Sequence, residues 1–387
     1  MARRASPRPS PRCSPSSILR SRSPRARLWR RIALISVLAL ATLAVVAFVS
    51  TRPSLRDRAE AAERSSDWPR ALIAYRDLLR ASPAPRARDR LGEARALLGL
   101  NLARQAESAL RVASHLDPAA AEPWHLRLEL LRVERRSLEA LAVAEQAIAA
   151  IDDSKGRREI LRDLTLALLF LDSSIDDASE DRARAMLARW VAADPEDDEA
   201  RASLALRRVA DPRPGDPTRE ALVSELSERL TRHPDRSALR EALILALADD
   251  GHVDAARERL DAWPFPLQDA RYQRLRGRWG LEYDGKAAEA AAAFTKTLEP
   301  FPHDWRSHYG LARALQKLDR KAESATEAET VAKLRERLER TRLTPRVARD
   351  LADLESPEAL QDLADLCAGV GLKGLAQAWA KEAAQLH

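Results

Sequence analysis

The stretch ERSSDWPRALIAY, residues 63–75, shows the unit from which most of the chain is built. A helix is expected to begin at Asp67, and Ala71 and Tyr75 follow at a step of four residues. This step places the two side chains on one face of an α-helix. Pro83 ends the unit, because proline cannot continue the backbone hydrogen-bond ladder.

The alanine at position 71 recurs along the chain, and we call its equivalents the register alanines. Ala106 and Ala140 follow at intervals of 35 and 34 residues. The later intervals are 43, 38, 35, 34 and 32 residues, at Ala183, Ala221, Ala256, Ala290 and Ala322. Prolines end further units at Pro118, Pro195, Pro234 and Pro302. Self-similarity at a period near 34 residues indicates a repeat architecture.

Each unit also contains an earlier helix. Small residues lie twelve positions before the register alanine, or before Ala376 in the last unit, at Ala59, Ala94, Gly310 and Ala364. Two helices approach closely only where small side chains lie between their axes. Turn glycines stand between the two helices at Gly99, Gly251, Gly285 and Gly371. Three tryptophans fall at core-facing positions: Trp68, Trp124 and Trp190.

This pattern resembles the tetratricopeptide repeat, a 34-residue helix-turn-helix unit with small residues at two close-approach sites and a terminal proline. Strong matches are Trp124 with Ala140, Ala144 and Ala147, and Gly285 with Ala290, Phe294 and Pro302. The resemblance covers residues 52–336 and 357–387. It implies an all-α fold, a right-handed α-solenoid of about eight or nine helix-turn-helix repeats after one transmembrane helix.

The expected domains follow from this resemblance. Residues 51–336 form the repeat array, residues 337–356 a helical joint, and residues 357–387 a C-terminal helix pair. The boundaries between 155 and 236 stay open, because two long units with extra loops lie there. In the third unit Leu128 replaces a small residue.

Composition supports a helical chain. Aromatic residues make up 4%, and helix formers fill nearly every segment after residue 55. The formal charge is +6, but residues 1–31 carry ten arginines and no acid, so subtracting +10 leaves −4 for the rest. A nucleic-acid partner is therefore not expected, because a basic footprint would have to lie on the folded domain.

Residues Ile32 to Val49 form an apolar run of eighteen residues without a charge, in which only Ser36 and Thr42 are weakly polar. At roughly 1.5 Å per residue the run covers about 27 Å, close to a bilayer core of about 30 Å. We expect a transmembrane helix over 32–50 and a disordered tail over 1–31. Arginines before the run place the tail in the cytoplasm and the repeats in the periplasm of a bacterial-type inner membrane. The competing interpretation is a signal peptide cleaved after Ala47.

The residues suggest no catalytic chemistry. There is no phosphate-binding glycine loop, no nucleophile elbow and no pair of histidines at metal-ligand spacing. Cys13 and Cys367 lie on opposite sides of the apolar run, so no disulfide is expected. Paired aspartates at 152–153, 176–177, 197–198 and 249–250 are interpreted as helix caps. We therefore expect no enzyme activity, no cofactor and no metal.

In the repeat family, peptide ligands lie along the first helices on the concave side. Matching positions here are Arg88, Arg95, His125, Glu129, Arg132, Glu241, Asp362 and Asp365. This face would change from basic near the membrane to acidic at the far end. The alternative is an ordinary solvated helix surface. The asparagine and lysine set with which some members clamp a C-terminal carboxylate is not found at matching positions.

The expected function is a membrane-anchored scaffold or adaptor that binds other proteins or peptides. One alternative is a self-assembling structural subunit of an envelope complex, which would make the chain a homo-oligomer. A second alternative is an uncharacterised envelope enzyme, for which no residue set can be named.

Overall fold

The computed structural model describes residues 54–171 and 174–386. Residues 55–387 form one compact unit of the chain, and the described part of it consists of nineteen α-helices and one short 3₁₀ turn, without strands. The predicted all-α repeat solenoid is confirmed. The predicted membrane span over 32–50 lies outside the described residues. Within the described ranges, no helix is both long and apolar enough to cross a bilayer.

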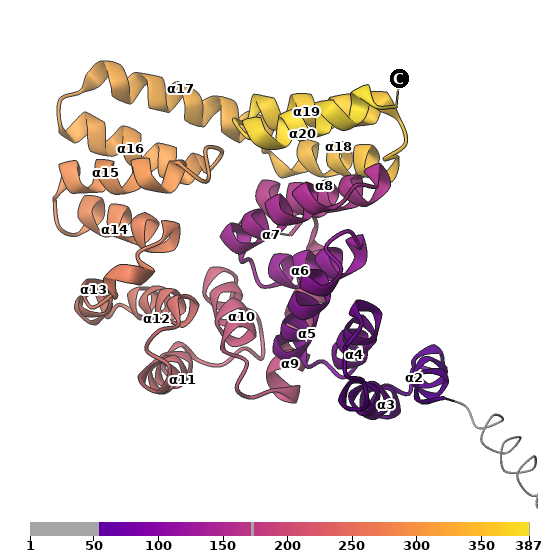
Figure 1. Cartoon of the computed structure of the whole chain (residues 1–387). Coiled ribbons are helices and arrows are strands. Elements are labelled where there is room, and N and C mark those ends of the chain that lie inside the picture. Colours follow the sequence, from indigo (N-terminus) through magenta and orange to yellow (C-terminus); the bar gives the residue numbers. More distant parts are fainter. Residues whose placement is uncertain (1–53, 172–173, 387) are drawn as a thin grey trace, which may run out of the picture. The chain divides into compact units, whose positions relative to one another are not determined.

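Most helices pack antiparallel against the next helix in the chain and are joined to it by a short turn (Figure 1). In chain order they are α2 (Leu55–Arg64), α3 (Trp68–Ala81), α4 (Ala87–Gly99), α5 (Ala103–Leu116), α6 (Ala121–Val133), α7 (Ser137–Ala150), α8 (Ser154–Leu169), α9 (Asp177–Ala193), α10 (Asp198–Ala210), α11 (Arg219–Arg232), α12 (Ser237–Asp249), α13 (Val253–Asp261), η1 (Phe265–Leu267), α14 (Ala270–Glu282), α15 (Ala287–Leu298), α16 (Trp305–Lys317), α17 (Lys321–Arg337), α18 (Arg340–Ala352), α19 (Pro357–Gly369) and α20 (Lys373–Ala384).

Aspartates begin many of these helices. Asp153, Asp176 and Asp197 each accept a hydrogen bond from a backbone N–H in the first turn of the helix that follows, as the sequence predicts for the paired aspartates. Such a cap satisfies a backbone donor that has no partner inside the helix. The pair at 249–250 is different, because it ends α12 instead of beginning a helix.

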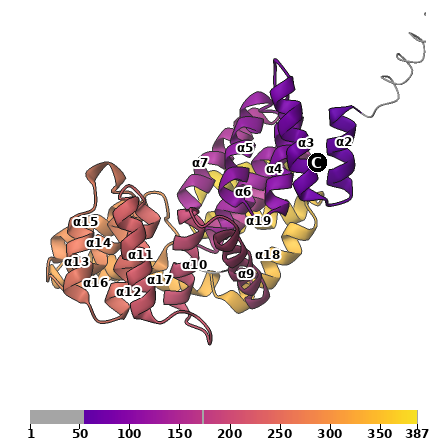
Figure 2. The ribbon, with the colours of Figure 1, turned by 90° about the horizontal axis from the view of Figure 1, so that it is seen from below.

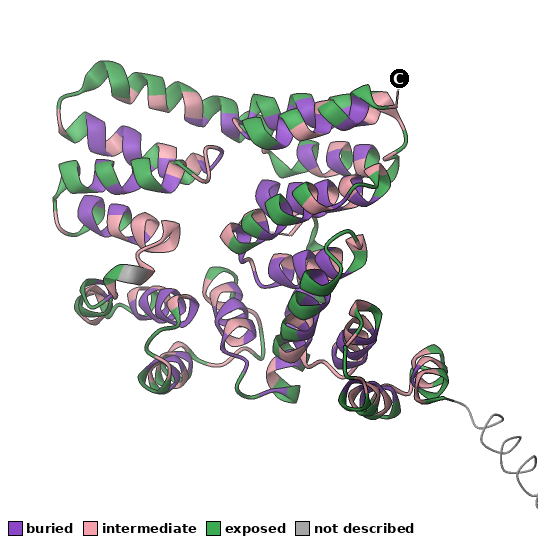
Figure 3. Cartoon of the chain, viewed as in Figure 1, coloured by how far each residue is buried: buried purple, intermediate pink, exposed green. Residues whose placement is uncertain are grey.

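Five register alanines lie where the two helices of a unit approach most closely. Each of them follows the N-cap of its second helix by four residues and is completely buried: Ala71, Ala106, Ala140, Ala256 and Ala290. Figure 3 shows many of the helices with a buried stripe along one side and an exposed stripe along the other. The helices are therefore amphipathic, and stacking of neighbours buries the apolar side.

The register prediction is wrong at Ala221 and Ala322, which are exposed. The residue four positions after the N-cap is Leu222 in α11 and Ser324 in α17. The Ser324 hydroxyl donates to the Ala312 carbonyl oxygen at 2.9 Å, so these two residues form the close approach between α16 and α17. Alanines are so frequent in this chain that a slip of one residue in α11, or of two residues in α17, still finds one.

Gly310, predicted as a close-approach residue between the two helices of its unit, instead makes room for an aromatic ring of the preceding unit. A Cβ atom at Gly310 would lie 2.4 Å from the ring of Phe294 in the preceding unit, and one at Gly92 would lie 2.1 Å from the ring of Tyr75. Real Cβ contacts are not this short, so both positions need glycine. In these two units the aromatic residue four positions after the register alanine therefore packs against a glycine in the next unit.

The middle of the array departs from regular stacking. α9 and α10 leave α8 and pack against α5 and α6 instead. Arg104 on α5 pairs with Asp194 at 3.0 Å, the Ser203 hydroxyl donates to the Glu134 carbonyl oxygen at 2.6 Å, and Arg207 donates to the Val133 carbonyl oxygen at 2.7 Å. The segment with open boundaries is thus the place where the chain changes neighbours.

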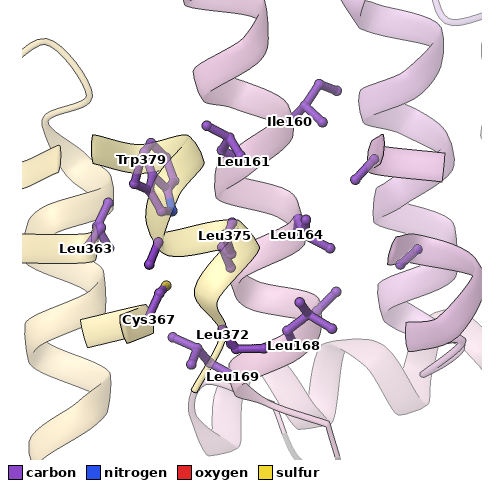
Figure 4. Close-up of a cluster of buried hydrophobic side chains, with 14 of the residues drawn as sticks. Ile160, Leu161, Leu164, Leu168, Leu169, Leu363, Cys367, Leu372, Leu375 and Trp379 are labelled. Carbon is purple, nitrogen blue, oxygen red and sulfur yellow. The ribbon is translucent and has the colours of Figure 1, made fainter. Parts of the chain in front are cut away.

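The C-terminal helices pack against the side of α8 that α9 does not cover (Figures 1 and 2). Trp379 is completely buried, and its indole N–H donates to the Thr165 hydroxyl at 2.9 Å. Arg157 of α8 pairs with Glu382 at 2.7 Å. Figure 4 shows Leu161, Leu164 and Leu168 of α8 facing residues of α19 and α20 in this core. Cys367 lies in the same core and is fully buried.

We expect Trp379→Ala to reduce the free energy of unfolding by about 3–5 kcal/mol, because it removes a buried indole and leaves Thr165 without its donor. Urea denaturation would measure the loss. Hydrogen exchange should become faster in residues 154–169, which lie more than 200 residues away in sequence. Phe265→Ala serves as control, since this ring is 84% exposed and its loss should cost under about 0.5 kcal/mol. Unchanged exchange in α8 would contradict the interpretation.

Candidate partner-binding groove

A groove lies between the first helices α2 and α4, with α3 behind it, and encloses about 560 Å³. We call it the α2–α4 groove. It is lined by Glu60, Glu63, Arg64, Trp68, Tyr75, Arg88, Asp89, Leu91 and Arg95. Two of the predicted partner-binding residues, Arg88 and Arg95, therefore meet in one concave site.

Helix register explains why these side chains share the groove. Arg88, Leu91 and Arg95 lie at steps of three and four, which puts them on one face of α4. Arg95 directly follows the buried Ala94, just as Glu60 directly follows the buried Ala59 in α2. The small residue fixes the helix against its partner, and the next residue consequently faces the inner side.

Arg95 is held at the centre of the groove by carboxylates on both neighbouring first helices. It pairs with Glu63 of α2 at 3.0 Å, and its Nε donates to Glu122 of α6 at 2.8 Å. The Tyr75 hydroxyl also donates to Glu63. Burial, together with this hydrogen bond to Glu63, raises the pKa of Tyr75 above its usual value, so the hydroxyl keeps its proton and remains a donor.

Asp89 forms the other wall of the groove. It is buried, and Arg56 of α2 donates to both of its oxygens at 2.7 Å. Bidentate pairs of this kind fix both side chains in one geometry. The groove therefore has walls that are already ordered before a ligand arrives.

Other groups in the groove remain accessible. The Arg88 side chain is 58% exposed, and its closest carboxylate is Asp89 at 3.9 Å. Arg64 is exposed, and Trp68 is half-buried over Gly99, where a Cβ atom would lie 2.3 Å from the indole. The groove thus offers guanidinium groups beside an aromatic surface. The prediction that Trp68 belongs to the core is only partly correct, whereas Trp124 and Trp190 are buried.

The predicted residues on α6 continue the inner face beyond the groove. His125 Nδ1 is hydrogen-bonded to Asp163 of α8, and this bond raises the pKa of His125 although burial lowers it. Glu129 and Arg132 follow at steps of four and three on the same helix. Arg132 lines a second cavity of about 230 Å³ between α6, α8 and α9.

The three remaining predicted residues lie neither in the groove nor on α6. Glu241 is buried and pairs with Arg274 at 3.2 Å, so it is not accessible to a partner and this assignment needs correction. Asp362 pairs with Arg349 at 3.0 Å, and Asp365 accepts a hydrogen bond from Gln361 at 2.8 Å. The expected change from basic to acidic is also not seen at the first end, because carboxylates and arginines alternate there.

Sequence reasoning did not nominate Glu63, Asp89, Trp68 or Tyr75 for the groove. A usable signal existed for the first of them. Glu60 and Glu63 hold the same positions after Ala59 that Arg95 and Leu98 hold after Ala94. Register comparison between units would therefore have placed opposite charges side by side.

The described ranges contain no cluster of histidine, cysteine and acidic residues that could hold a metal ion. Burial raises the pKa of the Cys367 thiol to about 12, so it carries little thiolate at neutral pH.

No protein family and no curated protein matches the sequence. Solved structures that resemble the chain include a tetratricopeptide repeat protein from Parabacteroides merdae, with 14% identity, a TM-score of 0.32, and 67% of this chain and 97% of that one covered. The P58(IPK) TPR domain has 14% identity and a TM-score of 0.31, covering 86% and 97%. The Cut9 and Hcn1 hetero-tetramer structure has 15% identity and a TM-score of 0.29, covering 95% and 79%. At these TM-scores the fold assignment rests on the helices themselves.

The His125 pair should make stability depend on pH. The raised pKa of His125 means that its protonated form stabilises the fold; this contribution is complete below about pH 6.5 and is lost as pH rises through the folded-state pKa. The urea midpoint of the wild type should therefore fall as pH rises above about 6.5. The midpoint of His125→Gln should fall less. His115→Gln, at an exposed position, is the control and should behave like the wild type. Identical pH profiles for wild type and His125→Gln would refute the expectation.

Proposed function

We propose that this chain is a non-enzymatic scaffold that binds a short segment of a partner protein in the α2–α4 groove. The observation that carries the proposal is the combination of fixed walls and accessible groups. Arg95, Glu63 and Asp89 are held in ion pairs, while Arg88, Arg64 and Trp68 remain open to a ligand. A preordered site loses less conformational entropy on binding.

The accessible groups define the ligand. A guanidinium group binds a carboxylate through charge-assisted hydrogen bonds. The indole of Trp68 and the side chain of Leu91 supply apolar area directly beside it. The best ligand is therefore a peptide in which an apolar residue stands next to an aspartate or glutamate.

The proposed location places this scaffold at a membrane. The apolar run from Ile32 to Val49 would cross a bacterial-type inner membrane with residues 1–31 in the cytoplasm and the repeats in the periplasm. The groove begins only a few residues after this run, at α2 (Leu55–Arg64). Labelling of single introduced cysteines with a membrane-impermeant reagent would test this topology, and labelling of residues 1–31 from outside would overturn it.

Arg88→Glu should weaken binding of a groove peptide by about tenfold, because it replaces a carboxylate partner by a like charge. Peptides would be selected from a random library against the full chain in a mild detergent, and their affinity measured by fluorescence anisotropy. Selected sequences should combine an acidic residue with an adjacent apolar one.

Arg111→Glu is the matched control, because Arg111 is exposed on the second helix α5 and does not line the groove. It should change the affinity by less than about twofold. Equal affinity of the selected peptides for the wild type and Arg88→Glu would remove the proposed function.

A further inference from the structure

A second charged surface lies on the inner side of α14 and α16, and we call it the α14–α16 patch. Its members are Arg278, Glu282, Tyr309, Arg313 and Lys317. None of them lines the α2–α4 groove. The patch belongs to first helices of later units.

The helix register places the patch on the same face as the groove. Arg313 directly follows Ala312, the close-approach residue of α16, just as Arg95 directly follows Ala94 in α4. Tyr309, Arg313 and Lys317 lie at steps of four and therefore along one side of α16. The register thus relates this side of α16 to the side of α4 that carries Arg95.

The patch holds more cations than anions. Arg278 donates to Glu282 at 2.9 Å, and Arg313 approaches the same carboxylate only to 3.8 Å. Lys317 donates to the backbone oxygen of Leu281 at 3.2 Å. One carboxylate therefore stands among three cations.

The equivalent arginine in the groove is neutralised much more fully. Arg95 has a glutamate on each side, Glu63 at 3.0 Å and Glu122, whereas Arg313 shares one distant glutamate with Arg278. At this equivalent position, Arg95 of α4 therefore has two carboxylate partners, whereas Arg313 of α16 has one at a longer distance. A negatively charged group of a ligand could therefore pair with Arg313 at α16.

An exposed aromatic ring adjoins these cations. Tyr309 is 52% exposed, which is high for a large side chain on a first helix of this array. The Arg313 guanidinium lies 5.7 Å from the centre of the Tyr309 ring. Such a cation–π contact orients the guanidinium and leaves its remaining N–H groups free to bind an acceptor.

We propose that the α14–α16 patch binds an acidic segment of a partner protein, with carboxylates bridging Arg278 and Arg313 and an apolar residue against Tyr309. This recognition site is separate from the α2–α4 groove and goes beyond its proposed function. Two contact points along one array also allow a single partner to bind more tightly than either point alone.

The test uses the full chain in a mild non-ionic detergent and a short fluorescent peptide in which pairs of glutamates alternate with leucine. Arg278→Gln combined with Arg313→Gln should weaken its binding by about tenfold, because charge-assisted hydrogen bonds are lost. Tyr309→Ala should weaken it by about threefold. Anisotropy titrations measure both effects, and thermal unfolding checks that the variants fold.

The control removes the same charge elsewhere. Arg111→Gln with Arg189→Gln changes two exposed arginines on the second helices α5 and α9 and should alter the affinity by less than about twofold. An equal loss in this control would overturn the proposal, because net charge alone would then explain binding. So would equal binding of a peptide with lysine in place of glutamate.

Two further results distinguish this site from others. If Arg88→Gln abolishes binding while the patch variant does not, the acidic peptide lies in the α2–α4 groove and the patch proposal fails. If a single-stranded RNA competes for the patch more strongly than the peptide, the partner class is wrong. Loss confined to the patch variants supports the proposal whether or not the groove binds its own peptide.

Discussion

The close approach of two helices at a small residue is the contact on which the array depends. Each completely buried alanine, such as Ala71 or Ala290, lets the axes of a helix pair come together and lets larger side chains fill the space around them. The same contact determines which residues face inward. Glu60, Arg95 and Arg313 are all inner-face residues because each one directly follows a close-approach residue. Packing between helices therefore places the charged groups with which a partner would interact.

A change of neighbours at α8 makes the C-terminal helices part of the same core as the third unit. α9 turns away to α5 and α6, and the side of α8 that it would cover is buried by α19 and α20. Trp379 and Glu382 complete this contact through Thr165 and Arg157. As a consequence, the C-terminal helix pair does not form a free end of the array. End-to-end stacking of copies through this pair would first have to separate a buried apolar core.

Charge is arranged differently at the two proposed recognition surfaces. In the α2–α4 groove most charged groups are used in ion pairs that fix the walls, so specificity depends on a few open groups such as Arg88. In the α14–α16 patch the carboxylates are too few for the cations around them. Ion pairs on a protein surface contribute little to stability on their own. Their main effect in the groove is to hold side chains in one geometry, which favours binding.

The sequence by itself determined the class of fold, the unit length and the close-approach positions of most units, because alanine, glycine and proline act on the backbone within a few residues. It also placed Arg88 and Arg95 on one face, since helix periodicity is local. The register assignment was wrong at Ala221 and Ala322, because an alanine also lies one or two residues from the true close-approach position. Only the tertiary structure decided that Glu241 is buried, that Arg95 lies between Glu63 and Glu122, and that α8 packs with α20. Those outcomes depend on contacts between residues far apart in the chain, and no local pattern encodes which surfaces will meet.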